Sequence, residues 1–503
     1  MRELELKFSV HEPFTLPELV TDSSPVGSVS RPTKATLRAT YYDTPDLRLA
    51  RSGITLRRRT GGSDAGWHLK LPIVGDQAGA RNEITAPLAG TAIPAELSGL
   101  VTAHVRGARL RTVATLRTSR ESFALFDRAG EEVAELVDDT VSVLDGTHVV
   151  ERFRELEVES KGAKLGFLKK VGAQLEASGA VAGTFMPKAI RALGSRASAP
   201  PDVSKPGEVT PRSSAGEVVT AFLQTHVTAL FTQDPLVRQG AEDAVHQMRV
   251  AARQLRSGLK TFRPLLDEEW AAAIREELNW LASSLGGARD SEVMAARFVR
   301  QIDAFEDEGL RAQASAAVTR SLTAAQRRGA TQMRASLTSP RYTALLDRLV
   351  AATAAPPLTE AAAGRAQDVL PPLANAAWRR LARACDAIDE DTPDETLHRT
   401  RILAKQARYA SEACALAFGQ PAARLAKQIV KVQDVLGEHQ DSTIAAAAVQ
   451  ELARSKTAAS SGQLGFALGI LYSMQVDAAD QARACFPGVW REVGRRTHRA
   501  WLA

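Results

Sequence analysis

Charged side chains spaced two residues apart mark the start of the chain. Glu3, Glu5 and Lys7 alternate with apolar residues in the stretch MRELELKFSV. A period of two is that of a β-strand, so the charged side chains share one face and the apolar side chains share the other. In an ordinary sheet the charges would face water, whereas in a barrel with a charged ligand in its lumen they would face inward.

The same alternation recurs through the first 195 residues. Arg57 and Arg59 share a face in ITLRRRT, and Arg81 and Glu83 share a face in RNEIT. The other charged side chains of this set are His68 with Lys70, the carboxylates Glu155, Glu157 and Glu159, and Arg117 with Arg120. Arg117 and Arg120 are three residues apart, so a bulge or a strand end would be required to bring them to one face. Arg and Lys bind phosphate oxygens, but clustered Glu would repel them unless Mg²⁺ or Mn²⁺ lay between. The pattern therefore predicts a site for a polyphosphate and a divalent cation.

Bulk properties limit the class of protein. The chain has 503 residues, which predicts two or more domains, and its net charge of +6 favours anionic partners. Its three cysteines are widely spaced and indicate neither a disulfide framework nor a zinc site. The longest apolar run, LGFALGILYSM at 464–474, is too short to span a bilayer. Since no signal peptide is visible, we expect a cytoplasmic protein without a membrane partner, which could associate with polyphosphate granules.

The texture of the chain changes near residue 195. Residues 1–195 contain short alternating runs separated by Gly and Pro, which predict strands, and one helical segment at 165–178. Residues 196–216 are rich in Ser and Pro and predict a linker. Residues 217–501 are rich in Ala, Leu and Arg with helical periodicity. We therefore predict an α+β multidomain protein with an all-α C-terminal part.

The helical part contains an internal repeat. VHQMRVAARQLR (245–256) is similar to LHRTRILAKQAR (397–408), and LGGARDSEV (285–293) is similar to LGEHQDSTI (436–444). The order of the two motifs is the same in both halves and their separation is nearly equal. This predicts two related helical bundles, at about 217–350 and 360–501.

Each repeat begins with a basic stripe at helical spacing. The members are His246, Arg249, Arg253 and Arg256 in the first repeat and His398, Arg401, Lys405 and Arg408 in the second, which Lys427 and Lys431 could extend. Like charges so spaced repel, so either a bound anion or local carboxylates such as Asp290 and Asp441 must offset them. Because no aromatic residues are interleaved, the stripes suit a phosphate chain better than single-stranded nucleic acid.

The ordered motifs of the strand part resemble the CYTH family, the triphosphate tunnel metalloenzymes. They are ExExK at 3–7, YYDT at 41–44, LRRR at 56–59, the strand of Lys70, Arg81 with Glu83, ELEVE at 155–159 and MPKAIRAL at 186–193. The resemblance implies a closed antiparallel β-barrel whose tunnel holds a triphosphate, with charged side chains pointing inward. The resemblance extends over nearly all of residues 1–195.

The resemblance also implies roles for individual residues. Glu3, Glu5 and Lys7 would be catalytic. The carboxylates of Glu3, Glu5, Glu155, Glu157 and Glu159 would hold Mg²⁺ or Mn²⁺, and the substrate would be bound by Lys7, Arg57, Arg59, Lys70, Arg81, Arg117, Arg120 and Lys188. Either Asp138 or Asp139 would match an acidic tunnel position. The family often has Lys where Arg117 stands.

The helical part resembles the CHAD family, and the two repeated motif pairs carry this resemblance. Members of that family are α-helical domains with a basic surface associated with inorganic polyphosphate. Together the resemblances imply a metal-dependent inorganic triphosphatase with a polyphosphate-binding module. Hydrolysis of thiamine triphosphate or nucleoside triphosphates, cyclisation of ATP, and a non-catalytic polyphosphate-binding or targeting role remain as alternatives. Nucleic-acid binding is a further alternative, which predicts comparable affinity for RNA at equal salt.

Overall fold

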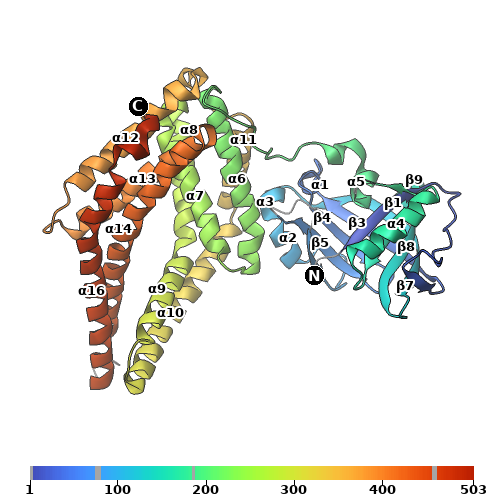
Figure 1. The fold of residues 1–503 in the computed structure, drawn as a ribbon, viewed down its shortest axis with the longest axis horizontal. Helices are drawn as coiled ribbons and strands as arrows, with labels where there is room; N and C mark the ends of the chain where they lie inside the picture. The colour runs from blue at the N-terminus through green and yellow to red at the C-terminus, as the bar shows by residue number, and fades with distance from the viewer. Residues whose placement is uncertain (1–3, 74–80, 184–186, 456–460, 503) are drawn as a thin grey trace. The chain divides into compact units, whose positions relative to one another are not determined.

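The computed structural model describes residues 4–73, 81–183, 187–455 and 461–502, apart from the side chains of residues 288 and 289. The contacts divide the chain into two compact units, Met1–Asp202 and Val203–Ala503. We call them the sheet unit and the helical unit and describe each by itself (Figure 1). The predicted α+β organisation, with strands first and helices after, is confirmed. The first part of the predicted linker packs on the sheet unit, since Gly194–Ser198 form η1 and Asp202 pairs with Arg51 at 2.9 Å.

A single antiparallel sheet of 10 strands dominates the sheet unit. Its path is β10-β1-β9-β8-β7-β3-β4-β5-β6, and β2 pairs with β7 beside this path. The strands are β1 (Glu5–Val10), β2 (Val26–Val29), β3 (Thr33–Asp43), β4 (Thr55–Thr60), β5 (Gly66–Pro72), β6 (Arg81–Ala86), β7 (Arg111–Asp127), β8 (Glu132–Asp145), β9 (His148–Ser160) and β10 (Val181–Ala182).

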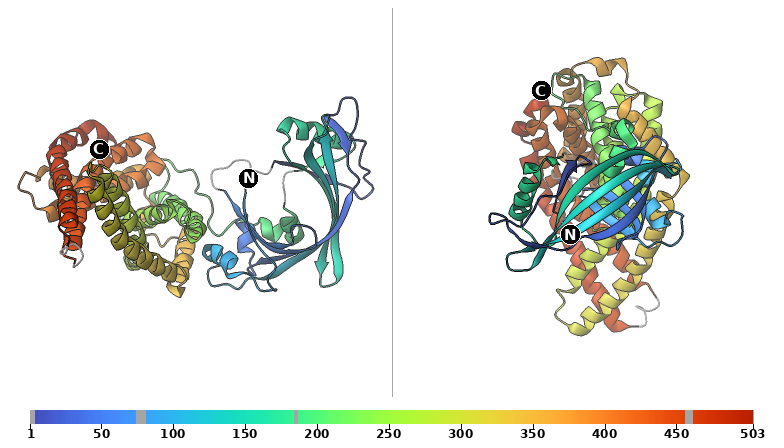
Figure 2. Two further views of the ribbon diagram at one scale, coloured as in Figure 1. Left: turned by 90° about the horizontal axis from the view of Figure 1, so that it is seen from below. Right: turned by 90° about the vertical axis from the view of Figure 1, so that its right-hand side faces the viewer.

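The sheet curves into a trough and does not close, so the predicted closed barrel is not observed (Figure 2, left). Closure would require β1 to pair with β6. Within the described residues β6 pairs only with β5, and β10 occupies the outer edge of β1 at Phe8 and Ser9. Burial lowers the pKa of Arg81 on β6, and the charge of Glu5 on β1 partly opposes this effect, so these two strands lie near each other.

The strand register separates the two faces of the sheet. Glu5 lies opposite Glu159 and Lys7 opposite Glu157, all on the concave face. Leu6 and Phe8 lie on the outer face against α4 (Leu165–Ala177). At the other end of the outer face, a second core covers β4–β6 with α2 (Ala95–Leu100) and α3 (Thr102–Val105). The period-two pattern of the first strand therefore predicted both faces correctly.

One end of the trough is filled by α5 (Lys188–Leu193). Ala189 packs there against Tyr41, Leu116, Val141 and other buried residues of the concave face. The helix begins at Lys188, directly after Pro187, so its first residue enters the trough. This placement brings a lysine distant in sequence to the charged strands.

The YYDT segment anchors the short helix α1 (Arg48–Arg51). The buried carboxylate of Asp43 accepts hydrogen bonds from the backbone N–H groups of Thr44, Leu49 and Ala50, at 2.7 to 2.9 Å. Two of these donors are backbone groups of a helix start, which would otherwise lack partners. Asp43 therefore fixes the connection between β3 and β4, the strand that carries Arg57 and Arg59.

The helical unit consists of long antiparallel helices. Two hairpins, α9–α10 and α14–α16, extend from a more compact group (Figure 1) and pack together through an apolar cluster that includes Phe298, Ile302, Val449 and Leu468. Its helices are α6 (Ala215–Gln239), α7 (Ala244–Thr261), η2 (Arg263–Leu265), α8 (Glu268–Ser284), α9 (Gly286–Ile302), α10 (Glu308–Leu337), α11 (Pro340–Ala354), η3 (Glu360–Ala363), α12 (Ala366–Asp386), α13 (Asp394–Phe418), α14 (Gln420–Ala453), α16 (Gly462–Val493) and η4 (Arg496–Leu502). Over the described residues, no helix has both the length and the apolar character needed to cross a bilayer.

The sequence repeat is also a structural repeat. Helices α7 and α13 carry the two basic stripes and are followed by the two LG motifs. Arg249 pairs with Asp290 at 3.0 Å, and the equivalent Arg401 pairs with Asp441 at 3.2 Å. A Cβ at Gly437 would lie 3.2 Å from Arg401 Nη2, so this glycine leaves room for the arginine.

We predict that Asp43→Ala lowers the local stability of the β3–β4 connection. Loss of a charged acceptor of buried N–H groups costs about 2 kcal/mol, which corresponds to amide exchange about 30-fold faster over residues 44–54. Hydrogen–deuterium exchange of the full chain measures this. Asp46→Ala, which removes a more exposed carboxylate from the same connection, is the control, and equal acceleration in both variants would contradict the role of Asp43.

Candidate metal and phosphate sites

An acidic wall lies on the concave face along β1 and β9. Glu5, Glu157 and Glu159 each offer a carboxylate oxygen, and these oxygens lie within 4.8 Å of one another. Lys7 lies beside them, with its Nζ 2.5 Å from Glu157 and 3.4 Å from Glu5. The wall is a direct product of the register, because alternate residues of two paired strands project to the same face.

The charges of the acidic wall are not balanced. Burial would raise the pKa of Glu157, but Lys188 and Lys7 outweigh this effect and lower the pKa to about 2. In contrast, burial together with the neighbouring Glu157 and Glu5 raises the pKa of Glu159. The cluster thus holds more negative charge than its lysines neutralise, as expected of a site for a cation.

A buried ion-pair network joins the acidic wall to α5 and β7. Arg120 donates two hydrogen bonds to Asp139, at 2.7 and 2.8 Å, and Lys188 contacts the same carboxylate. Lys188 Nζ also lies 2.9 Å from Glu155 and 3.5 Å from Glu157. Burial would lower the pKa of Lys188, but these carboxylates raise it instead. The lysine is therefore held as a cation.

The register also decides between the two candidate aspartates. Asp139 faces the concave side and is fully buried, with Arg120 directly opposite on β7. Asp138 faces the outer side, where Arg154 donates hydrogen bonds to both of its oxygens, at 2.7 and 2.9 Å. Asp139 is therefore the aspartate of the trough.

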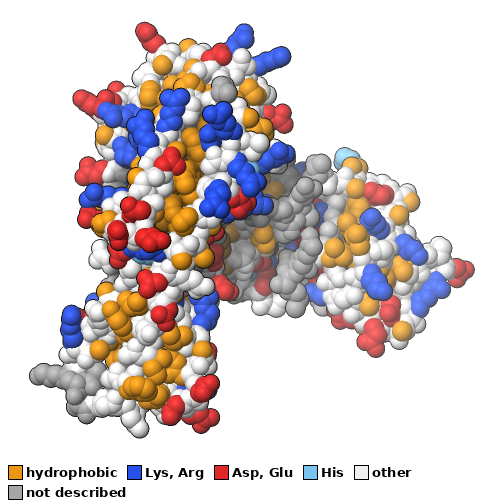
Figure 3. All heavy atoms as spheres, turned by 60° about the vertical axis from the view of Figure 1, so that its left-hand side comes forward, with side chains coloured by type: hydrophobic (Ala, Val, Ile, Leu, Met, Phe, Trp, Pro, Cys, Tyr) orange, Lys and Arg blue, Asp and Glu red, His pale blue; other side chains and the backbone are white. Residues whose placement is uncertain are grey.

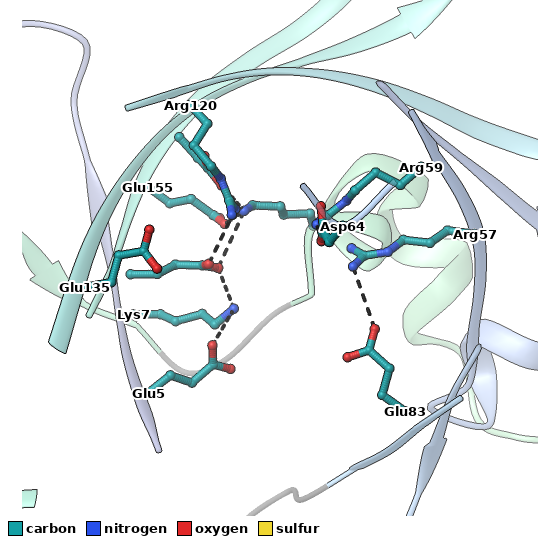
Figure 4. A network of polar contacts seen from close by, with 12 residues as sticks. Glu5, Lys7, Arg57, Arg59, Asp64, Glu83, Arg120, Glu135 and Glu155 are labelled. Carbon is teal, nitrogen blue, oxygen red and sulfur yellow. Dashed lines mark hydrogen bonds and ion pairs between the residues drawn. The ribbon is translucent and has the colours of Figure 1, made fainter. Parts of the chain in front are cut away.

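A basic wall on β4, β5 and β6 faces the acidic wall across the trough (Figure 4). Arg57 and Arg59 extend from β4, and Arg59 contacts Asp64. The Nε atoms of both arginines are buried without a hydrogen-bond partner among the described residues. Buried guanidinium nitrogens of this kind are suited to bind an anion that enters the trough.

Glu83 organises the rest of the basic wall. It lies 2.9 Å from His68 Nδ1, 3.1 Å from Lys70 Nζ and 4.0 Å from Arg57. Burial would raise the pKa of Glu83, but the hydrogen bond from His68 and the charge of Lys70 lower it to about 2. His68 Nε2 also lies 2.9 Å from the carbonyl oxygen of Asp64. His68 shares the face of Lys70, and this signal was present in the sequence.

The structure places nearly all predicted tunnel residues on the concave face, with one exception and one omission. Arg117 lies on the outer face and is exposed, because the ladder with β8 runs without a bulge from Arg117 to Arg120. The prediction that Arg117 joins Arg120 is therefore wrong. Glu3 lies outside the described residues. The residues found on the concave side are Glu5, Lys7, Arg57, Arg59, Lys70, Arg81, Arg120, Glu155, Glu157, Glu159 and Lys188.

The acidic wall fits a divalent metal ion. Its donors are carboxylate oxygens alone, which hard cations such as Mg²⁺ and Mn²⁺ prefer over nitrogen or sulfur. Glu5, Glu157 and Glu159 would hold the ion, and their excess of negative charge is the feature that favours it. The donor set does not distinguish Mg²⁺ from Mn²⁺.

The helical unit contains a separate cleft of about 900 Å³ between α7, α8 and α13. Arg253, Arg256 and Lys260 line it from α7, Arg275 from α8, and Lys405 from α13. In the view of Figure 3, Lys and Arg side chains gather over the upper part of the helical unit, and hydrophobic side chains occupy much of its lower part.

Positive charge in the cleft is poorly compensated. Burial and the charges of Arg401 and Arg253 lower the pKa of Lys405 to about 8. Burial and nearby arginines, Arg380 first among them, also lower the pKa of Lys260. A lysine loses its proton more easily only where its charge is insufficiently stabilised. A bound anion would supply the missing negative charge.

Other members of the two stripes are already neutralised by carboxylates. Arg249 and Arg401 pair with Asp290 and Asp441, so the carboxylate alternative holds for the first arginine of each stripe. Arg408 lies 3.2 Å from Glu412 and Lys431 lies 2.5 Å from Glu492. The remaining predicted members, His246, His398 and the exposed Lys427, are absent from the residues that line the cleft.

Lys260, Arg275 and Tyr409 were not predicted to contribute to the cleft. Lys260 continues the spacing of the first stripe by one turn, so the sequence contained that signal. Arg275 lies on α8 and only tertiary packing brings it to the cleft. Tyr409 supports two cations, with its ring 5.8 Å from the guanidinium of Arg253 and 4.5 Å from that of Arg408.

The described residues thus form two parts, a curved sheet with opposed acidic and basic walls and a repeated helical unit with a basic cleft. Family models match in the same order, the CYTH domain over residues 1–183 and the CHAD domain over residues 221–450. The chain belongs to the family of CYTH–CHAD proteins, as the sequence motifs predicted.

Two relatives align with nearly the whole of this chain. The uncharacterized proteins MT2285 and Rv2226 of Mycobacterium tuberculosis are each 34% identical to the chain over 528 residues, covering 99% of the chain and 97% of the relative. Among solved structures, PptA from Streptomyces chartreusis is 28% identical, with a TM-score of 0.49, and covers 56% of this chain and 100% of its own. The CHAD domain from the plant Ricinus communis is 26% identical, with a TM-score of 0.45, and covers 57% of this chain and 95% of its own.

We predict that Glu159→Gln weakens Mn²⁺ binding by at least about tenfold, because it removes one of three clustered carboxylate ligands. In the wild type the affinity falls as the pH is lowered, since protons compete for the ligands. The fall begins at a higher pH than for an ordinary Glu, because the pKa of Glu159 is raised. Electron paramagnetic resonance of free and bound Mn²⁺ measures both effects.

The matched control is Glu121→Gln, which removes the same charge from the outer face of the same sheet, where Glu121 pairs with Lys34. It should leave the Mn²⁺ affinity within about twofold of wild type. Equal weakening in both variants would show that only the net charge matters and would contradict the assigned cluster.

Proposed function

We propose that the sheet unit is a metal-dependent hydrolase of inorganic tripolyphosphate and that the helical unit binds polyphosphate. The observation that carries this proposal is the arrangement of the trough, where a carboxylate cluster faces a wall of arginines. A substrate of phosphate groups and a divalent cation would satisfy both walls together. Neither wall alone would favour such a ligand.

The basic wall would bind and orient the substrate. Arg57 and Arg59 would contact phosphate oxygens through guanidinium groups whose Nε atoms lack other partners, and Lys70 and Arg81 would add charge at the trough edge. Lys188 and Arg120, held in place by Asp139, would meet the phosphate nearest the acidic wall. The triphosphate would thereby be held with one terminal phosphate beside the acidic wall, and positioning with charge neutralisation is what phosphoryl transfer requires.

The acidic wall would support the attack of water on a terminal phosphorus. A cation held by Glu5, Glu157 and Glu159 would polarise phosphate oxygens and neutralise their charge. Water forms the new P–O bond, the bond to the bridging oxygen breaks, and pyrophosphate leaves. A carboxylate of this wall would orient that water and accept its proton.

Other substrates and a non-catalytic role are less well supported by the trough. Among the concave-face residues of the described strands, Tyr41 is the aromatic side chain nearest the basic wall, and it is buried in the core beneath α5. A base or a thiazole ring would therefore find little to stack on. A pure anion receptor would gain nothing from clustered carboxylates, which repel phosphate.

The helical cleft would bind a linear polyphosphate through the cations that have no carboxylate partner among the described residues. Arg253, Arg256, Lys260 and Lys405 form one continuous lining, while the outer members of the two stripes are neutralised. The binding surface would therefore belong mainly to the first repeat and the facing side of α13. It would not extend evenly over both stripes.

We predict that the protein releases phosphate from tripolyphosphate rapidly and only with a divalent metal ion. Release should be faster than from long-chain polyphosphate, thiamine triphosphate or ATP. Glu5→Gln should lower kcat/KM by about 100-fold or more, because it weakens charge stabilisation in the transition state. Arg57→Gln should raise KM for tripolyphosphate, whereas Arg117→Gln should leave the kinetics unchanged because Arg117 lies on the outer face. Phosphate release with Mg²⁺, Mn²⁺ or chelator measures all of these rates.

Two results would contradict the catalytic proposal. If the folded wild type released phosphate from none of the four substrates, the sheet unit would be a receptor for phosphate compounds and not a hydrolase. An Arg117→Gln defect equal to that of Arg57→Gln would contradict the assignment of the basic wall to one face.

For the cleft, we predict that Arg253→Gln combined with Arg256→Gln weakens binding of long-chain polyphosphate by at least about tenfold. Wild-type affinity should fall as the pH rises past about 8, where Lys405 loses its proton and its charge. Lys405→Arg should abolish this pH dependence, because arginine stays charged. Fluorescence anisotropy of labelled polyphosphate at fixed salt measures the affinities.

The control for charge removal is Arg408→Gln combined with Lys431→Gln, two stripe members that already pair with Glu412 and Glu492. This variant should retain wild-type affinity within about threefold. A loss as large as that of the cleft variant would instead place the ligand along the second stripe.

A further inference from the structure

Within the described residues of the sheet unit, no helix packs on the centre of the outer face of the sheet. The core with α4 covers it beside β1 and β9, and the core with α2 and α3 covers it behind β4–β6. Between these cores, on β3, β7 and β8, the outer face carries short hydroxyl side chains such as Thr36, Thr115, Ser119, Thr140 and Ser142. A polar face in this position is common in antiparallel sheets, but its charges are not evenly mixed.

Three arginines form one row across this surface. Arg38 on β3 lies directly opposite Arg117 on β7, Arg117 lies opposite Ser142 on β8, and Ser142 lies opposite Arg152 on β9. We call Arg38, Arg117 and Arg152 the outer arginine row. All three side chains are exposed. The small Ser142, third of the four positions across the strands, leaves room between the guanidinium groups.

The outer arginine row has little local compensation. Like charges that lie directly opposite on paired strands repel each other. Arg152 lies 4.0 Å from Glu12, and both side chains are more than half exposed, so this pair contributes little. In the described part of the chain, Arg38 and Arg117 form no ion pair within 4 Å. The nearest acidic residues of the neighbouring rows are already engaged, since Glu121 pairs with Lys34 and Asp138 with Arg154.

We propose that the outer arginine row is a second anion-binding surface of the sheet unit, and that it binds the chain of a long inorganic polyphosphate. The row lies on the opposite face of the sheet from the trough, so it is separate from the hydrolytic site. The choice of ligand rests on the proposed function, whereas the existence of an anion site rests on the row itself.

The chemistry of the row favours polyphosphate over the other polyanions. On β3, β7, β8 and β9, the positions paired in line with Thr36 and those paired in line with Ser142 hold no aromatic residue. Nucleic-acid bases would therefore find no stacking platform there. The face also lacks the apolar anchors that protein interfaces need at their centre. Arginine forks and neighbouring hydroxyls match the oxygens of a phosphate chain in both charge and donor type.

The test uses the full chain with Arg38→Gln combined with Arg117→Gln. Both side chains are exposed and unpaired within the described residues, so the fold should persist, which circular dichroism checks. The measurement is the affinity for long-chain polyphosphate at several salt concentrations, in the wild type and in the background of Arg253→Gln with Arg256→Gln. We expect a loss of about tenfold in that background and a shallower dependence on salt.

The matched control is Lys169→Gln with Lys170→Gln, which removes two exposed charges from α4 in the same unit. It should change the affinity by less than about twofold. Tripolyphosphate hydrolysis should be unchanged in the outer-row variant. If the proposed function failed, the wild type would not bind polyphosphate or the cleft variant would lose no affinity. If only this inference failed, the unexpected result would appear in the outer-row variant alone.

Three outcomes would overturn the inference. The outer-row variant could bind polyphosphate as tightly as its background. The α4 control could lose as much affinity as the outer-row variant, which would indicate net charge alone. Single-stranded RNA of similar length could bind as tightly as polyphosphate and lose affinity equally, which would make the row a nucleic-acid surface.

Discussion

The buried ion-pair network around Asp139 is the interaction on which the sheet unit depends. A carboxylate with no exposure to solvent is tolerated only with close cationic partners, and Arg120 and Lys188 provide them. The partners come from β7 and from the first residue of α5, so the network ties the strands of the acidic wall to a helix far along the chain. The same cations keep Glu157 ionised beside Glu5 and Glu159. Structural charge balance and readiness for a metal ion are therefore two consequences of one arrangement.

Incomplete charge balance is the feature shared by the trough, the cleft and the outer face. The trough has an excess of negative charge on one wall and, on the other, buried arginine Nε atoms without a hydrogen-bond partner among the described residues. The cleft has a lysine whose pKa is lowered by burial and by its cationic neighbours. A folded protein accepts such costs of repulsion where a ligand relieves them, and phosphate compounds with divalent cations could relieve all of them.

The internal repeat shows how duplication and divergence act on a charged surface. Arg249 with Asp290 and Arg401 with Asp441 are equivalent pairs, so the scaffold of the stripes is retained in both repeats. The positions beyond them differ, since Lys260 of the first repeat corresponds to Glu412 of the second. That single change of sign neutralises Arg408 and leaves the cleft on one side of the repeat. Asymmetry of function thus arises from side chains while the helical framework remains similar.

Local periodicity in the sequence determined which side chains share a face. The period of two identified the charged face of β1 and β9, and helical spacing with repetition identified α7 and α13 as carriers of basic stripes. Only the tertiary structure decided what depends on pairing between distant segments. It placed Arg117 outside and Asp139 inside, because the register of β7 with β8 runs without a bulge from Arg117 to Arg120. It left the sheet open, because β10 and not β6 pairs with the edge of β1. It also brought Arg275 to the cleft and neutralised Lys431 with Glu492, since contacts between elements far apart in the chain leave no trace in local spacing.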